Sequence, residues 1–304
     1  MIRTLFLLLC TATLSAQTVL PLFPEGTACI SNEPATFVDK DDVGRLLTAV
    51  SEPSLEHHAP VPRAANGRAI MIIPGGGYMV NAWELEGIDI ARTFTQAGYH
   101  SFILRYRLPG RSTPECAHHI ALDDARRGVQ LIRHLADSLG YATDQVAVMG
   151  FSAGGHLAAS LAVYSLPADP TANPPVARFS SRPDYSLPIY PVTIMDGSPA
   201  GHLGSMRALL GPPEQQRPEL AARYNLPARV HAYVPPTFIA HAADDTVVPV
   251  ANALRYYQAL LDYGVPAELH VFPRGGHGFG SGVGYEGTVR KWLQLALNWL
   301  DAQQ

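Results

Sequence analysis

Residues 145–156 read Gln-Val-Ala-Val-Met-Gly-Phe-Ser-Ala-Gly-Gly-His, and they place Ser152 at the centre of the motif Gly150-Phe151-Ser152-Ala153-Gly154. The apolar run before the motif is typical of a buried strand, and the residues from Ala153 to Val163 favour a helix. Glycines on both sides of a serine permit the strained turn that such a strand and helix need, and a helix N-terminus favours developing negative charge. A chance Gly/Ser turn is the alternative, but this context predicts that Ser152 is a nucleophile.

From Ala69 onward, short apolar runs alternate with longer amphipathic stretches. This alternation is typical of βαβ units around a parallel sheet, so we expect an α/β fold with a mostly parallel, doubly wound sheet flanked by helices. The expected strands are Ala69 to Ile73, Ser101 to Tyr106, Gln145 to Met149, Tyr185 to Tyr190, Thr237 to His241 and Glu268 to Phe272. The expected helices are Ile88 to Ala97, Ile120 to Leu139, Ala153 to Val163, Ala251 to Tyr263 and Glu286 to Asp301.

Two stretches lie outside this alternation. Gln17 to Arg68 has only weak periodicity and is expected to be an entry segment with a short hairpin. Ser165 to Pro236 is rich in Pro and Gly, so we expect loops and short helices there, over the carboxyl ends of the strands, where they would shape a substrate pocket.

The first residues resemble a secretory signal. Arg3 precedes an apolar run from Leu5 to Leu9, and small polar residues follow as far as Ala16. We expect cleavage after Ala16, residues 17–304 as a single catalytic domain, and a secreted or periplasmic protein. Lipidation at Cys10 is the alternative. Removal of the signal leaves Cys29 and Cys116, which could pair, although spacing alone does not establish this.

Composition excludes several other classes. The chain of 304 residues has 47% hydrophobic and 16% charged residues, and its net charge of -4 has no acidic or basic block. Such a balance argues against nucleic acid as a partner. No stretch has the roughly 20 apolar residues that a membrane-spanning helix needs. Nothing in the sequence indicates an oligomeric state.

A serine nucleophile requires a base, and the base requires a carboxylate that orients it. His277 lies among glycines directly after the last expected strand, where a histidine can reach Ser152. His156, four residues after Ser152, is expected to pack on its helix. Other histidines lack a comparable position after a strand, namely His118, His119, His134, His202 and His231.

The orienting acid should follow the strand that begins at Thr237. Asp244 and Asp245 both satisfy this, and both could reach the histidine. We choose Asp245 because it lies three residues before Val248-Pro249, whereas Asp244 could cap the loop or the next helix.

Backbone N–H groups should stabilise the oxyanion of an acyl-transfer intermediate. The loop Pro74-Gly75-Gly76-Gly77-Tyr78 follows the first clear strand, where such donors belong. We expect Gly76, Gly77 and Ala153 to form the oxyanion hole and Tyr78 to contact substrate, with the donor within Gly76 to Tyr78 left open. The sequence has neither a metal-ligand cluster nor a phosphate loop, so we predict no metal and no cofactor.

Several motifs together resemble the bacterial carbohydrate acetyl esterases, which are acetylxylan-esterase-like α/β-hydrolases. The resemblance extends from about Arg68 to Leu300. Its motifs are Pro74-Gly75-Gly76-Gly77-Tyr78, Glu86-Gly87, Leu104-Arg105-Tyr106-Arg107-Leu108-Pro109, Gly150 to His156, Tyr190-Pro191-Val192 and Gly275-Gly276-His277-Gly278. The resemblance implies the α/β-hydrolase fold, the triad Ser152, Asp245 and His277, and an acetylated plant polysaccharide or oligosaccharide as substrate.

Two other functions are compatible with parts of the sequence. A feruloyl or general short-chain carboxylesterase would differ in its acyl pocket, which the sequence does not define. A non-catalytic carbohydrate-binding module has no need of a nucleophile, acid, base and glycine loop in this order, so the motifs argue against it.

Overall fold

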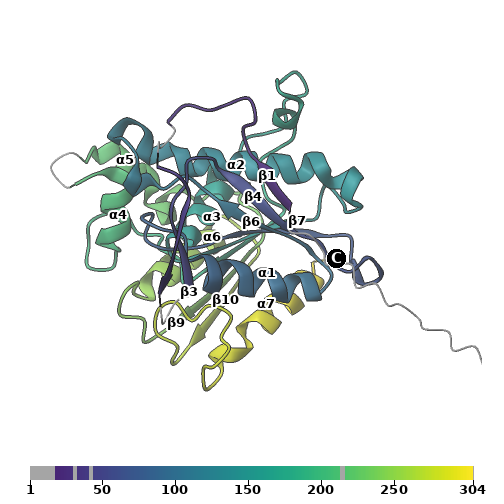
Figure 1. Cartoon of the computed structure of the whole chain (residues 1–304). Helices are drawn as coiled ribbons and strands as arrows, with labels where there is room; N and C mark the ends of the chain where they lie inside the picture. Colours follow the sequence, from purple (N-terminus) through teal and green to yellow (C-terminus); the bar gives the residue numbers. More distant parts are fainter. Residues whose placement is uncertain (1–17, 30–32, 41–43, 213–215, 304) are drawn as a thin grey trace, which may run out of the picture.

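The computed structural model describes residues 18–29, 33–40, 44–212 and 216–303, and their arrangement is drawn in Figure 1. Within these residues, the central sheet has the strand order β1-β4-β6-β5-β7-β8-β9-β10. Strands β1 and β4 pair antiparallel with their neighbours, and the strands from β6 to β10 are parallel. The bounds are β1 Thr18–Pro21, β4 Ser54–His58, β5 Ala69–Ile73, β6 His100–Arg105, β7 Val146–Phe151, β8 Tyr185–Ile189, β9 Thr237–Ala242 and β10 Ala267–Phe272. The expected mostly parallel α/β sheet is therefore confirmed.

Helices cover both faces of the sheet, with α1 and α7 on one side and α2, α3 and α6 on the other (Figure 1). The bounds are α1 Asp89–Gln96, α2 Pro114–Leu139, α3 Ala153–Val163, α4 Leu203–Leu210, α5 Pro218–Tyr224, α6 Ala251–Asp262 and α7 Trp292–Asp301. Short 3₁₀ turns are η1 Pro62–Ala64, η3 Pro109–Arg111, η4 Pro175–Arg178, η6 Leu226–Arg229 and η7 Val289–Lys291, and η2 Glu84–Ile88 is a π-helix.

Two helices begin more than one residue away from the position that the sequence predicted. Helix α2 begins at Pro114, before the expected Ile120, because proline suits the first turn of a helix, where its missing N–H is not needed. Helix α7 begins at Trp292, after the expected Glu286, since Gly287 has a φ of 76°, which a right-handed helix cannot accommodate.

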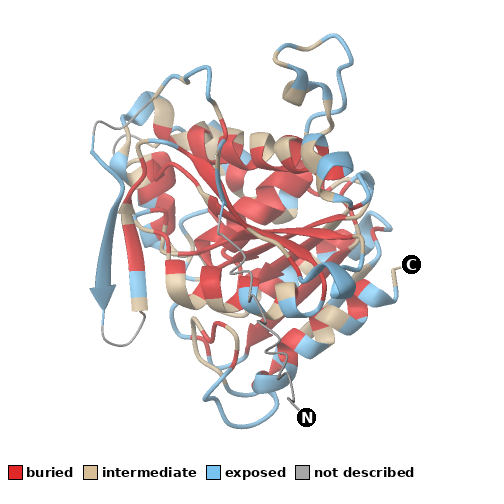
Figure 2. Ribbon diagram, turned by 45° about the vertical axis from the view of Figure 1, so that its right-hand side comes forward, coloured by how far each residue is buried: buried red, intermediate tan, exposed pale blue. Residues whose placement is uncertain are grey.

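The centre of the sheet is fully buried. Every residue of β5 and β7 is buried, as expected for parallel strands with helices on both faces, and Figure 2 shows the buried layer continuing into the facing helices. Burial on both faces explains the continuous apolar runs Ala69–Ile73 and Val146–Met149. This rigid centre carries the turn at Ser152.

The N-terminal segment differs in part from the prediction. The expected hairpin is present as the antiparallel pair β2 Thr36–Lys40 and β3 Gly44–Ala49. Strands β1 and β4 were not predicted; they extend the main sheet beyond β6. Residues 1–17, which contain the expected signal and its cleavage position, lie outside the described residues.

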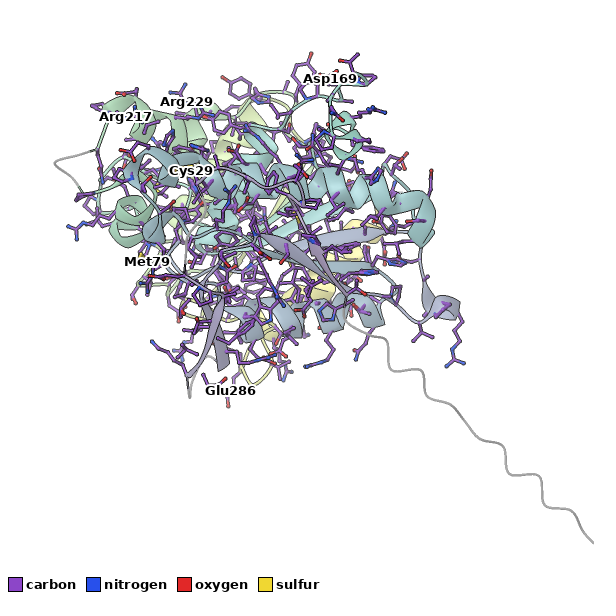
Figure 3. All side chains as sticks on the ribbon, turned by 45° about the horizontal axis from the view of Figure 1, so that its top comes forward. Cys29, Met79, Asp169, Arg217, Arg229 and Glu286 are labelled. Atoms are coloured by element: carbon purple, nitrogen blue, oxygen red, sulfur yellow. A yellow bond between two sulfur atoms is a disulfide. The ribbon has the colours of Figure 1, made fainter. Side chains whose placement is uncertain are left out.

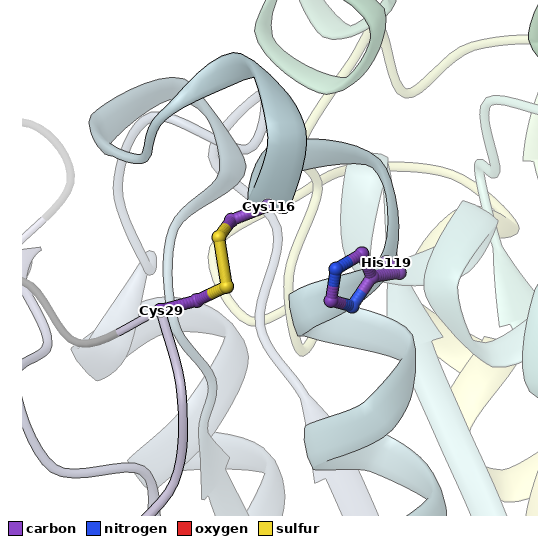
Figure 4. A group of neighbouring side chains, drawn as sticks. All are labelled: Cys29, Cys116 and His119. Atoms are coloured by element: carbon purple, nitrogen blue, oxygen red, sulfur yellow. A yellow bond between two sulfur atoms is a disulfide. The ribbon is translucent and has the colours of Figure 1, made fainter.

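Cys29 and Cys116 form a disulfide (Figure 4), which settles the pairing that the sequence left open. Linking residues 87 positions apart restricts the unfolded chain and contributes about 2–4 kcal/mol to the free energy of unfolding. His119 lies near the two sulfurs, but a disulfide has no thiolate to offer a metal. In the described ranges this is the one group of three potential metal ligands.

A buried ion pair supports the same region. The Arg107 guanidinium contacts the Asp124 carboxylate at 2.6 Å and also donates to the carbonyl oxygen of Ala28 at 2.6 Å. Arg107 therefore joins β6, α2 and the N-terminal segment next to the disulfide. None of the helices formed by described residues is long and apolar enough to cross a membrane.

Candidate active site

The turn between β7 and α3 places Ser152 at the carboxyl end of the central strand. Ser152 has a φ of 53° and a ψ of -116°, an unfavourable conformation for a residue other than glycine. Its N–H donates to the Ile189 carbonyl, and its own carbonyl accepts from the N–H groups of His156 and Val192. These bonds fix the strained turn from both sides.

The glycines of the motif are required by close packing. A Cβ on Gly150 would lie 2.1 Å from the Gly154 carbonyl oxygen, and one on Gly154 would lie 2.3 Å from the Ile73 carbonyl oxygen. Neither approach is possible for a larger residue. The motif therefore presses the turn at Ser152 against the end of β5, where the glycine loop begins.

His277 contacts Ser152 from a loop after β10. Its Nε2 lies 2.9 Å from the Ser152 hydroxyl, and its Nδ1 lies 2.7 Å from Oδ2 of Asp245. A carboxylate can only accept, so Nδ1 carries the proton and Nε2 is free to accept from the hydroxyl. The flanking Gly276 and Gly278 have φ values of 60° and 76°, which lets the loop turn back over the sheet.

The structure places Asp245, and not Asp244, against the imidazole. Asp245 follows β9 and is buried, and its Oδ1 accepts the N–H groups of Val247 and Val248 at 2.9 and 2.8 Å. The more exposed Asp244 instead accepts the Gly276 N–H at 2.8 Å. Asp244 thus supports the histidine loop without touching the ring of His277.

The electrostatics at Asp245 favour its charged form. Burial alone would raise the pKa of Asp245, but hydrogen bonds from His241 and His277, the charge of His277 and the Val248 N–H outweigh it. The pKa of Asp245 is therefore held well below its usual range. An ionised carboxylate is what the imidazole needs when it takes up a proton.

His241 is a contact that the sequence interpretation missed. It is fully buried on β9, and its Nε2 lies 2.8 Å from the Val248 carbonyl oxygen and 3.2 Å from Oδ2 of Asp245. Because carbonyl and carboxylate oxygens can only accept, Nε2 carries the proton, which lies between the Val248 carbonyl and the Asp245 carboxylate. Its place at a strand end, four residues before the acid, was the available signal.

The glycine loop lies beside Ser152 as expected. Gly76, Gly77 and Tyr78 all have positive φ values, of 122°, 64° and 64°. Within the part of the chain that the structure describes, the N–H groups of Gly76, Gly77 and Ala153 have no acceptor in the protein. They are therefore available to a ligand. Met79, the next residue, is partly exposed at the surface, where Figure 3 labels it.

The Tyr78 side chain is packed inside the protein. Its ring is 1% exposed, and its hydroxyl lies 2.7 Å from Nδ1 of His156, whose Nε2 contacts the Tyr224 carbonyl oxygen at 3.0 Å. Burial lowers the pKa of His156 to about 4, so this ring is neutral near pH 7. The expected packing role of His156 agrees with these contacts, and the buried side chain of Tyr78 is not placed to contact a substrate.

Comparisons with known proteins identify the family. The family model described as BD-FAE matches residues 55–260. An acetylxylan esterase of Xylanibacter ruminicola is 33% identical over 243 residues, which cover 79% of this chain and 46% of that protein. Endo-1,4-beta-xylanase B of Butyrivibrio fibrisolvens is 36% identical over 210 residues, which cover 69% of this chain and 32% of that protein. The chain thus spans less than half the length of these two relatives.

One solved structure is similar over nearly its whole length. The acetyl ester-xyloside bifunctional hydrolase from Caldicellulosiruptor lactoaceticus has a TM-score of 0.79 and 31% sequence identity, over 94% of this chain and 96% of that one. The family match includes both the turn at Ser152 and the loop at Asp245. The chain therefore belongs to the BD-FAE family, among the acetylxylan-esterase-like α/β-hydrolases.

Proposed function

We propose that this protein is a serine-dependent carbohydrate ester hydrolase that removes acetyl groups from xylan or related plant oligosaccharides. The observation that carries the proposal is the hydrogen-bonded series Ser152, His277 and Asp245 beside a glycine loop with free N–H groups. The relatives named as an acetylxylan esterase and an acetyl ester-xyloside hydrolase support the substrate class.

In the first step, the Ser152 hydroxyl attacks the carbonyl carbon of the acetyl ester while Nε2 of His277 takes the hydroxyl proton. Asp245 stabilises the resulting imidazolium through the proton on Nδ1. The carbonyl oxygen becomes an oxyanion that accepts from Ala153 and from Gly76 or Gly77. Because these donors are backbone groups fixed in place, they stabilise the charge without reorganising.

The intermediate then breaks down. The bond between the carbonyl carbon and the sugar oxygen breaks, and that oxygen takes the proton from Nε2 of His277. An acetyl group remains on Ser152. Water, deprotonated by the same nitrogen, attacks this acyl-enzyme, and the reverse proton transfer releases acetate and restores the Ser152 hydroxyl. No metal or cofactor takes part in these steps.

Polar groups of the loops within residues 165–236 are proposed to recognise the sugar. His202, at the start of α4, accepts the Ser205 N–H on its Nδ1 at 3.1 Å, so the neutral ring carries its proton on Nε2. Burial lowers the pKa of His202, and the charge of nearby His277 lowers it further. His202 is thus a neutral donor near the triad, suited to a sugar hydroxyl. Tyr78 would contribute through its backbone.

Acetylated xylo-oligosaccharides are expected to be cleaved with a higher kcat/KM than butyryl, octanoyl or feruloyl esters. A pocket that closes around one methyl group discriminates against each further methylene by roughly 1–3 kcal/mol. The measurement is kcat/KM across this series at one pH. A preference for octanoyl or feruloyl esters would replace the acetyl-esterase assignment with a general or feruloyl esterase and leave the triad in place.

We further propose that residues 1–16 are a signal peptide and that residues 17–304 form a single exported catalytic domain. The Cys29–Cys116 disulfide supports export, since disulfides persist in oxidising compartments. In an exporting host, the active protein is expected outside the cytoplasm with its N-terminus at Gln17. N-terminal sequencing tests this, and active cytoplasmic protein that retains Met1 would contradict it.

A further inference from the structure

Glu86 is a buried carboxylate with no role in the chemistry above. It lies in the π-helix η2, is 4% exposed, and belongs to the motif Glu86-Gly87. Among the described residues, no Lys, Arg or His nitrogen lies within ion-pair distance of its carboxylate. An acidic side chain is costly to bury without such a partner, so its hydrogen bonds must account for its position.

Each carboxylate oxygen of Glu86 accepts one hydrogen bond. Oε2 accepts the N–H of Gly75 at 2.7 Å, and Oε1 accepts the hydroxyl of Tyr190 at 2.8 Å. The Tyr190 hydroxyl also accepts the N–H of Gly280 at 3.2 Å, so its own proton is directed to Glu86. A continuous series of hydrogen bonds therefore runs from Gly75 to Gly280.

The first end of this series lies in the glycine loop, against the nucleophile. A Cβ built on Gly75 would lie 2.8 Å from Oε2 of Glu86 and 3.0 Å from Cβ of Ser152. The Gly75 backbone is therefore held between the carboxylate and the serine. Its N–H is committed to Glu86, and the following N–H groups of Gly76 and Gly77 remain for the oxyanion.

The other end lies in the loop that carries His277. The Tyr190 ring, which follows β8, packs edge-on against the His277 ring with a centroid distance of 5.2 Å, and against Phe279 at 4.5 Å. Tyr190 itself has a φ of 34°, and its N–H donates to the Ala240 carbonyl at 2.7 Å. A residue held in this unfavourable conformation next to the imidazole indicates a functional constraint.

We propose that Glu86 and Tyr190 are positioning residues. They hold the glycine loop, residues 74–78, and the loop that carries His277 in fixed positions around Ser152. This inference rests on the proposed function, because it concerns the donors and the base of that reaction. Glu86 acts through Gly75, and Tyr190 acts through Gly280 and the face of His277. Catalytic geometry must hold to within a fraction of an ångström, and a shift of 1 Å costs about 100-fold in rate.

The test compares variants of the full chain in hydrolysis of one acetyl ester. Tyr190→Phe removes the hydroxyl but keeps the ring, and Glu86→Met removes both acceptors at similar volume. Each is expected to lower kcat roughly 10- to 100-fold and to leave KM within about twofold. Glu86→Gln keeps an acceptor for Gly75 but turns a donor toward Tyr190, whose proton then loses its acceptor, so its kcat should lie between those of the wild type and Glu86→Met.

Tyr256→Phe is the matched control. Tyr256 is a buried tyrosine on α6 whose hydroxyl has no hydrogen-bond partner among the described residues, so its loss should leave kcat unchanged. The double variant Glu86→Met/Tyr190→Phe should be little worse than the poorer single variant, because both interrupt one series of contacts. Near-ultraviolet circular dichroism establishes that each variant is folded.

A boronic acid that forms a tetrahedral adduct with Ser152 separates positioning from general destabilisation. Because the adduct resembles the tetrahedral intermediate, its inhibition constant should rise in Tyr190→Phe by about the same factor by which kcat/KM falls. The inhibition constant of the deacetylated sugar should stay unchanged. Folded Tyr190→Phe and Glu86→Met with wild-type kcat would overturn the inference. An active Ser152→Ala variant would instead overturn the proposed function, so the two failures are distinguishable.

Discussion

Replacing Ser152 with alanine is expected to reduce ester hydrolysis to the background rate in a protein that remains folded. The Ser152 oxygen is the atom that Nε2 of His277 faces, at 2.9 Å. Loss of a triad nucleophile commonly lowers kcat by on the order of 10⁴-fold or more. The change keeps the Cβ and removes a single oxygen, so the packing around α3 should persist. Release of acetate from an acetylated xylo-oligosaccharide is the measurement.

Ser160→Ala is the matched control for this variant. Ser160 is buried on the same helix, and in the part of the chain that the structure describes its hydroxyl has no hydrogen-bond partner. Its replacement should leave kcat/KM unchanged within error. If Ser152→Ala keeps a turnover similar to that of Ser160→Ala, Ser152 is not the nucleophile and the proposed mechanism is wrong.

Much of the fold could be predicted because its signals are local. The runs Ala69–Ile73 and Val146–Met149 are continuous apolar segments, and burial on both faces of a parallel sheet requires this pattern. The expected helix at 153–163 was found at the same residues. In contrast, β4 gains its order from pairing with β6, and β1 pairs in turn with β4, contacts that no local pattern reveals.

The site was predictable to a similar extent. Ser152, Asp245 and His277 each follow a strand in a recognisable local context, and parallel strands bring their carboxyl ends to one edge of the sheet. Glu86 and Tyr190 belong to motifs of the resemblance, but the sequence assigned no role to them or to His241. Their importance depends on contacts such as that between Glu86 and Tyr190, 104 positions apart, which appear only when the chain is folded. The buried ring of Tyr78 likewise could not be distinguished from an exposed one by sequence.

Asp245→Asn is expected to impair turnover far more than Asp244→Asn. The amide cannot stabilise the imidazolium, and its NH₂ group can leave the ring in the wrong tautomer, so kcat should fall by on the order of 10³- to 10⁴-fold. Asp244 accepts one hydrogen bond from the Gly276 N–H on the surface, and its replacement should cost less than about tenfold. The two variants form a matched pair, since they make the same chemical change at adjacent residues. A larger loss in Asp244→Asn would transfer the orienting role to that residue.

Stability against pH gives a second measurement for Asp245→Asn. The pKa of Asp245 is lower in the folded protein than in the unfolded chain, so its carboxylate stabilises the fold above the unfolded pKa of about 4. This contribution is lost as the pH falls, because the unfolded chain then takes up a proton more readily than the folded protein does. Asp245→Asn should therefore lower the free energy of unfolding at pH 7. It should also make this free energy fall less steeply as the pH is lowered below about 5. Denaturant titrations at several pH values measure both effects. A slope that is unchanged in Asp245→Asn would mean that the hydrogen bonds from His241 and His277 do not hold this carboxylate in its charged form.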